Sequence, residues 1–257
     1  MSLVSELKDQ YNRLGYFKIE GFFEKKFVNE IQNEIDLLKT QVNGKITIYN
    51  NNEGHVHRIE HFYQSTKKIN LANKLILEKL KEIFNEEFAI FKDKCNAKHP
   101  GETVFAHYDS IYQWKDSAGN IKKGWHEYAD EFITVLVALD DLTPKNGPLE
   151  LSKWHNEKYE KLIERLERNG TPYLTDEHES KCKFEKIFAN AGSLIFFSSK
   201  CPHRSSKNNS NESRRSLYMT YNPIKFGDHY DSYFKDKKTS QNRASKSLIS
   251  SGNKTDY

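Results

Sequence analysis

Cysteine is scarce in this chain. Its 257 residues include three cysteines, Cys95, Cys182 and Cys201, which lie far apart and form no Cys-x-x-Cys pair. A sparse, odd set of this kind is typical of reduced thiols in a cytoplasmic protein. Cys201 lies two residues before His203, and we interpret it as a small apolar residue in a turn rather than as a metal ligand.

Long apolar runs are also missing. The longest aliphatic run, residues 132–139, is far too short to cross a bilayer. The first 17 residues lack the apolar core of a signal peptide. We therefore expect no membrane partner and a cytoplasmic location.

The sequence has no block of like charge. Its 40 basic and 36 acidic residues give a net charge of +4, and no basic stripe of the kind that binds nucleic acid is present. We therefore expect no nucleic-acid partner. The apolar fraction of 36% is low, but a chain of 257 residues is long enough to bury a core and to leave a cavity in it.

The spacing of apolar residues predicts helices first and then many strands. Helical spacing covers residues 3–13, 24–40, 71–84 and 156–168. Strand patterns cover residues 16–19, 87–98, 102–109, 132–139, 187–188, 193–197 and 214–221, and a long loop is expected over 114–130. This order predicts an α+β fold, a double-stranded β-helix (jelly-roll or cupin-like barrel) with flanking helices. We expect one domain over residues 1–234 and a polar, disordered tail over residues 235–257.

Two histidines and a carboxylate stand out in this pattern. His107 and Asp109 are two positions apart in a predicted strand, so both side chains point to the same face. His203 follows 96 positions after His107. Two imidazoles and one carboxylate are the usual ligands of non-haem iron(II) oxygenases, and they leave coordination positions open. The pattern therefore predicts a catalytic Fe(II) centre held by His107, Asp109 and His203.

A pair of arginines follows the second histidine. Arg214 lies 11 residues after His203, and Arg214 and Arg215 open the last predicted strand on opposite faces. The arginine that faces the cavity can grip a carboxylate with two parallel hydrogen bonds, and Ser205 can add a hydroxyl to the same carboxylate. This arrangement suits a dicarboxylate co-substrate beside the metal.

Several motifs resemble a known family. FAHYDSIY, then FITVLVALDDLTPKNGPLEL, then AGSLIFFSSKCPHRSSKNNSNESRRSLYMTYN are similar to the phytanoyl-CoA dioxygenase family of iron(II)/2-oxoglutarate oxygenases. HRIEHF, FKDKCNAKHPGE and GDHYDSYFKDK resemble a bacterial branch that acts on small molecules, so the resemblance spans about residues 10–237. It implies that His107, Asp109 and His203 bind iron. It also implies that Arg214 binds the distal carboxylate of 2-oxoglutarate, with Ser205 nearby and Thr134 in the same pocket.

The resemblance also implies the reaction. 2-Oxoglutarate and O₂ would give succinate and CO₂ while an unactivated C–H bond of the substrate is hydroxylated. Family members that halogenate have a small residue in place of the carboxylate, so Asp109 indicates hydroxylation. The sequence departs from the family at residues 152–155, where Ser-Lys-Trp-His replaces a frequent Gly-Ser-His motif in a loop that shapes the cavity.

Four polar residues are candidates for binding the substrate. Lys94, Asn96 and Lys98 share one face of the strand before the iron ligands, and Arg58 shares a face with Glu60 if that segment is extended. Basic groups with a carboxylate suit a small anionic or zwitterionic metabolite, such as an amino acid or an aminophosphonate, rather than an acyl-CoA. Part of the basic set can instead hold 2-oxoglutarate. We expect a small-molecule partner and a monomer or homodimer.

Other functions fit parts of the same pattern. A nucleic-acid demethylase would use the same iron chemistry but needs a basic groove with stacking aromatics. A non-catalytic jelly-roll protein that binds a metabolite would need no reaction at all. A dioxygenase with a similar triad but no 2-oxo acid is a third alternative.

Overall fold

Amphipathic helices begin the fold, as their apolar spacing predicts. The computed structural model describes residues 2–40, 45–116, 118–154, 158–164, 173–239 and 249–250. Its α-helices are α1 (Leu3–Leu14), α2 (Lys25–Leu38), α3 (Lys67–Phe84), α4 (Tyr159–Ile163), α5 (Asp176–Lys181) and α6 (Tyr230–Thr239). None of these is long and apolar enough to cross a membrane within the described residues.

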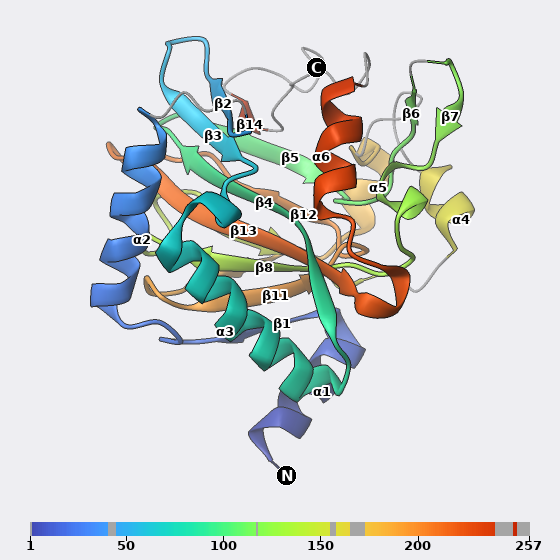
Figure 1. Cartoon of the computed structure of the whole chain (residues 1–257), viewed down its shortest axis with the longest axis horizontal. Helices are drawn as coiled ribbons and strands as arrows, with labels where there is room; N and C mark the ends of the chain where they lie inside the picture. The colour runs from blue at the N-terminus through green and yellow to red at the C-terminus, as the bar shows by residue number, and fades with distance from the viewer. Residues whose placement is uncertain are drawn as a thin grey trace.

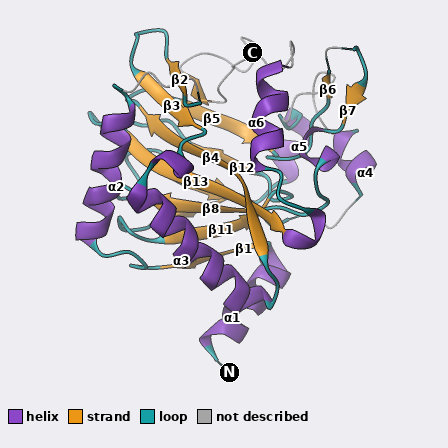
Figure 2. Ribbon diagram, viewed as in Figure 1, coloured by secondary structure: helices purple, strands orange, loops and turns teal. Residues whose placement is uncertain are grey.

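A seven-stranded antiparallel sheet is the larger of two sheets that face each other (Figures 1 and 2). Its order is β1 (Tyr16–Ile19), β11 (Leu194–Ser198), β8 (Ile133–Ala138), β13 (Arg214–Pro223), β4 (Phe88–Lys98), β3 (Val56–Glu60) and β2 (Thr47–Asn50). Helices α2 and α3 lie across its outer face in Figure 1.

The smaller sheet has five strands. Its order is β10 (Glu185–Ile187), β9 (Leu149–Leu151), β12 (His203–Ser205), β5 (Thr103–His107) and β14 (Ile249–Ser250). From β4 to β13 the chain passes back and forth between the two sheets, which form a double-stranded β-helix, as the sequence predicts. A separate hairpin of β6 (Trp114–Lys115) and β7 (Ile121–Lys122) lies in the segment that the sequence predicts to be a loop.

The central strand β8 is buried on both faces. Val135 and Val137 point outward and pack with α2 and α3 in the main apolar core. Thr134 and Leu136 point to the other face, toward the interior of the barrel. This explains why residues 132–139 form one continuous apolar run in the sequence.

Gly15 joins α1 to β1 and has a backbone conformation that other residues rarely adopt. Its φ of 85° ends the helix, and its amide donates to Tyr11 O. A β-carbon here would lie 2.5 Å from Trp154 and 2.6 Å from Cys201. Cys201 therefore has the structural role that the sequence suggests, in the turn before His203.

Helix α6 crosses the predicted domain boundary at residue 234. Helix α6 continues to Thr239 because Tyr230, Tyr233 and Phe234 bury their rings against the rest of the fold. Apart from residues 249–250, the predicted disordered tail beyond this helix lies outside the described residues, as do parts of the predicted helix over 156–168.

A buried carboxylate ties α6 and the segment after β3 to β4. Asp93 is fully buried on the outward face of β4. Its oxygens accept hydrogen bonds from the amides of His61, Phe62 and Tyr63 at 2.8–3.1 Å and from the Tyr230 hydroxyl at 2.9 Å. One side chain thus holds two chain segments against the large sheet.

We expect Asp93→Ala to lower the free energy of unfolding by about 3 kcal/mol, because it leaves amide donors without acceptors in a buried site. Urea denaturation followed by circular dichroism measures this change. The same substitution at the exposed Asp9 is the control and should cost under about 0.5 kcal/mol. Equal losses in the two variants would show that the Asp93 hydrogen bonds are not important for stability.

Candidate metal centre

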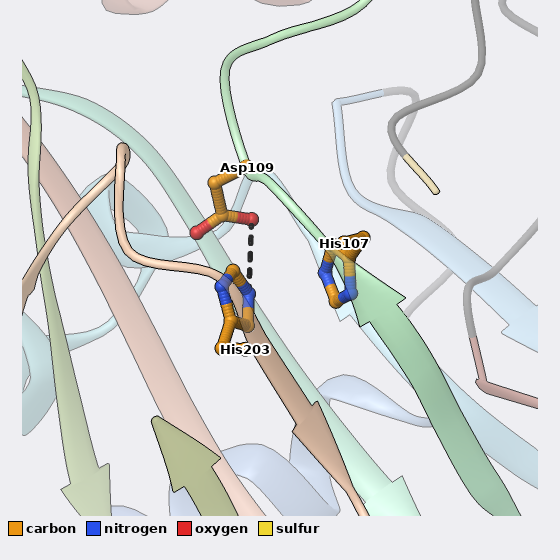
Figure 3. A group of neighbouring side chains, drawn as sticks. All are labelled: His107, Asp109 and His203. Carbon is orange, nitrogen blue, oxygen red and sulfur yellow. Dashed lines mark ion pairs between the residues drawn. The ribbon is translucent and has the colours of Figure 1, made fainter. Parts of the chain in front are cut away.

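Two strands of the smaller sheet bring the three predicted ligands together. His107 is the last residue of β5, and His203 is the first residue of β12. These strands are antiparallel neighbours, and His203 is the register partner of His107. The ring centroids of the two histidines lie 4.1 Å apart, and His203 Nε2 lies 3.8 Å from Asp109 Oδ1 (Figure 3).

Asp109 reaches this cluster from a loop rather than from the strand. β5 ends at His107, so the predicted alternation within a strand does not itself place Asp109. The chain turns after the buried Tyr108, and the carboxylate points back toward His203 (Figure 3). The candidate ligand atoms of His107, Asp109 and His203 all lie within 4.8 Å of one another, and the three residues are 2%, 8% and 5% exposed.

Backbone carbonyls orient both imidazoles. His107 Nδ1 lies 2.7 Å from Phe105 O, and His203 Nδ1 lies 3.0 Å from Cys201 O. Since a carbonyl only accepts, each Nδ1 is the protonated nitrogen, and each Nε2 has a free lone pair. Burial also lowers the pKa of both histidines, which favours the neutral form that binds metals.

Neighbouring groups keep the Asp109 carboxylate ionised. Burial alone would raise the pKa of Asp109, but its neighbours, the charge of Lys94 first among them, outweigh burial and hold the pKa below its usual value. Lys94 Nζ lies 3.9 Å from Asp109 Oδ1, and the Thr134 hydroxyl donates to Oδ2 at 3.2 Å. Thr134, predicted to lie in the co-substrate pocket, thus contacts a candidate ligand directly.

This donor set fits a divalent transition metal. It offers two imidazole nitrogens and one carboxylate oxygen from one side of a buried point, which is the ligand set that suits iron(II) with open positions. The hydrogen bonds to Nδ1 and to the carboxylate are of the kind that hold metal ligands in place.

Two buried cations form a second cluster. Arg214, the first residue of β13, is the register partner of Lys98, the last residue of β4. Both side chains donate to the carbonyl of Gly147, Lys98 at 3.3 Å and Arg214 at 3.2 Å. Lys98 also donates to the Ser205 hydroxyl at 2.7 Å. Within the described residues, neither cation forms an ion pair with a carboxylate.

The electrostatics of this cluster favour an anion. Burial, with repulsion from Arg214, lowers the pKa of Lys98 to about 7. Burial also lowers the pKa of Arg214. A bound carboxylate would relieve both effects, because it places a negative charge between two positive groups. Arg215, by contrast, points outward and pairs with Asp140 at 3.0 Å, so Arg214 is the inward member of the pair.

The predicted substrate residues divide into two groups. Arg58, Lys94 and Asn96 line one cavity with His107 and His203. Arg58 Nε donates to Asn96 Oδ1 at 3.1 Å. Lys98 was predicted with this group, but it does not line this cavity; it lies beside Arg214 and donates to Ser205, whose side of the cavity it adjoins. The reason is that Lys98 is at the end of β4, four residues beyond Lys94 along a strand.

The prediction missed four residues that line the cavity, which are Val104, Leu149, Arg204 and Tyr218. Tyr218 lines it, and Lys94 Nζ lies 4.8 Å above the ring centroid of Tyr218. A signal was present, because Tyr218 is four residues after Arg214 in the same predicted strand and so shares its face.

Comparisons with known proteins give a consistent result. The sequence profile described as phytanoyl-CoA dioxygenase matches residues 11–216. A 2-aminoethylphosphonate dioxygenase from an uncultured bacterium is 28% identical over 244 residues, which cover 91% of this chain and 87% of that protein. A methylphosphonate hydroxylase from Gimesia maris is 30% identical over 159 residues, which cover 62% of this chain and 54% of that protein.

Solved structures share the fold. The apo form of EctD from S. alaskensis has a TM-score of 0.67 at 18% identity, and the match covers 88% of this chain and 78% of that one. The epimerase SnoN, solved in complex with Fe³⁺, alpha-ketoglutarate and nogalamycin RO, has a TM-score of 0.65 at 15% identity over 86% of this chain and 84% of that one.

We expect His203→Ala to abolish tight binding of Fe(II), or of Mn(II) in its place, in anaerobic titration calorimetry. Thr134→Val should weaken binding by about tenfold, because loss of a partner that orients a ligand typically costs 10- to 100-fold. The exposed Thr40→Val is the control. Unchanged affinity in Thr134→Val would mean that its hydroxyl does not position Asp109.

Proposed function

Since this chain belongs to the phytanoyl-CoA dioxygenase family, we propose that it is an iron(II)- and 2-oxoglutarate-dependent oxygenase that hydroxylates a small phosphonate. The observation that carries this proposal is the placement of two anion-binding groups beside one candidate metal centre. One is the Lys98–Arg214 pair, and the other is the Arg58–Lys94 side of the cavity.

Each cluster has a role in this proposal. His107, Asp109 and His203 hold the iron. Arg214 and Lys98, with the Ser205 hydroxyl that Lys98 contacts, bind the distal carboxylate of 2-oxoglutarate. The bound iron and 2-oxoglutarate supply the oxidising chemistry, in which 2-oxoglutarate and O₂ give succinate and CO₂ as a substrate C–H becomes C–OH.

In this proposal, the residues of the protein position the metal ligands and the substrate. Thr134 and the carbonyls of Phe105 and Cys201 fix the directions of the ligands, so little reorganisation is needed when the metal binds. The buried barrel interior excludes water from the reacting carbon. Arg58 and Lys94 would hold an anionic head group at the other end of the substrate.

A phosphonate head group is supported by charge and by the relatives. Arg58 and Lys94 are cations within a buried cavity, and a phosphonate brings up to two negative charges and three acceptor oxygens. The two curated relatives named above act, according to their names, on 2-aminoethylphosphonate and on methylphosphonate. This supports a phosphonate over an amino acid.

We expect the Fe(II)-loaded protein to release succinate when a short phosphonate is present, and to give a product heavier by one oxygen atom. Arg214→Met should raise the KM for 2-oxoglutarate by about tenfold or more, because charge-assisted hydrogen bonds contribute about 1.5–3 kcal/mol. Arg215→Met is the matched control, because Arg215 is the neighbouring arginine that points outward. Coupled succinate assays and mass spectrometry measure both quantities.

Three outcomes of this experiment would count against the proposal. No succinate with any phosphonate, despite metal binding, would favour a non-catalytic metabolite-binding protein. Full activity of Arg214→Met would favour a dioxygenase that uses no 2-oxo acid. Turnover triggered by a methylated oligonucleotide instead would favour a nucleic-acid demethylase.

The KM for 2-oxoglutarate should depend on pH through Lys98. The pKa of Lys98 is lowered to about 7, so its positive charge is present below that pH and is lost above it. We therefore expect the KM to rise between about pH 6.5 and pH 8.5, by at most tenfold per unit. Lys98→Arg should give a low KM without this rise, and Lys98→Met a high KM without it. A rise that persists in Lys98→Met would assign the titration to another group.

A further inference from the structure

We infer that the substrate is a phosphonate without an amino group, because the cavity beside the metal ligands is positively charged and its nearby carboxylate, Glu60, is already neutralised. This inference rests on the proposed function and makes its substrate class narrower. It concerns the part of the barrel interior formed by β3, β4, β13 and α6.

Positive charges gather on the inward face of β4 and beside it. Lys92 and Lys94 alternate with outward residues on β4, so both point into the barrel. Lys92 Nζ lies 4.6 Å from the ring centroid of Trp125, and the charges of Glu60 and Asp109 both act on it. Arg58 on β3 contributes a third cation to this region.

A fourth cation comes from the C-terminal helix. Helix α6 lies beside β4 (Figure 1), and its Lys237 forms an ion pair with Glu60 Oε2. These four cations face two carboxylates, Glu60 and Asp109, and Asp109 is a candidate metal ligand. A bound metal dication would add to this positive excess.

Glu60 is already held by three partners that an ammonium group would have to compete with. It is 1% exposed. Arg58 Nη1 lies 3.4 Å from Oε1, while the Tyr49 hydroxyl donates to Oε2 at 3.3 Å and Lys237 binds the same oxygen. Burial would raise the pKa of Glu60, but the charges of Lys237 and Arg58 outweigh burial and keep it ionised. A substrate ammonium would have to approach Glu60 beside Lys237 and Arg58, whose positive charges repel it.

The other residues that line the cavity offer no negative charge to a substrate ammonium group. Among the described residues that line it, the groups other than the cations and the two histidines are Asn96, Tyr218, Ser205 and the apolar Val104 and Leu149. None of these is a carboxylate. An ammonium group in this space would lie near Arg58 and Lys94 and be repelled by both, whereas an alkyl chain would contact Val104 and Leu149. The chemistry therefore favours a short alkylphosphonate dianion.

The test compares two substrates of the same shape. n-Propylphosphonate and 2-aminoethylphosphonate differ by a methyl in place of an ammonium group. With the Fe(II)-loaded protein and 2-oxoglutarate, we expect kcat/KM for propylphosphonate to be at least tenfold higher, measured by succinate release and product mass. Equal values, or a preference for the amino compound, would overturn this inference but leave the proposed function standing. No turnover of these two or of methylphosphonate would overturn both.

A pair of variants tests the role of Glu60. Lys237→Met removes one of the cations that neutralise Glu60, so the preference for propylphosphonate should fall at least threefold. Lys235→Met, an exposed lysine on the same helix, should leave that ratio unchanged. Thermal unfolding of both variants checks that α6 stays folded. An unchanged ratio in folded Lys237→Met would refute the assignment of the selectivity to a neutralised Glu60.

Discussion

The pairing of β5 with β12 is the constraint on which the candidate site depends. It sets His203 opposite His107 and fixes the distance between the two rings. Everything else at the metal centre is arranged around this pair: Asp109 returns to it from a loop, and Thr134 reaches Asp109 from the opposite sheet. The carbonyls that orient the two imidazoles belong to Phe105 and Cys201, two residues before each histidine.

Buried positive charge is the second organising feature. A buried cation is costly inside a protein unless an anion compensates it. Within the described residues, Lys98 and Arg214 form no ion pair with a carboxylate, whereas Arg58 pairs with Glu60 and Lys94 with Asp109. These cations form two neighbouring groups, one around Lys98 and Arg214 and one around Arg58 and Lys94, with Ser205 between them. Two such groups suit two anions, which is what an oxygenase with an anionic co-substrate and an anionic substrate requires.

The sequence predicts most elements that have apolar spacing and misses several short strands. Helices α1–α3 and strand β8 follow their apolar patterns, and the candidate triad was found from residue types and order. The strands β2 and β3 were missed because the barrel interior here holds Arg58 and Glu60, so the usual relation between polarity and exposure is reversed. β12 was missed because it has three residues and is held by pairing with β5 and β9.

Residue partners depend on register, which residue types alone do not give. Lys94 and Lys98 look equivalent in the sequence, but only Lys98 pairs with Arg214. The role of Thr134 was also unclear, because a buried threonine in an apolar strand has no mark that distinguishes it from its neighbours. Thr134 matters because its hydroxyl donates to Asp109, which lies in the loop after β5 of the other sheet.

The candidate ligands lie on or beside the smaller sheet, whereas Arg214, Lys98 and Thr134 belong to the larger one. The distance between the two sheets therefore sets where the candidate metal ligands lie relative to Arg214, Lys98 and Thr134. Substitutions in the apolar layer between them, for example at Leu136 or Leu151, would slide one set of groups relative to the other without touching either. Such substitutions would change the position of the co-substrate relative to the metal, although every side chain that contacts either of them stays the same.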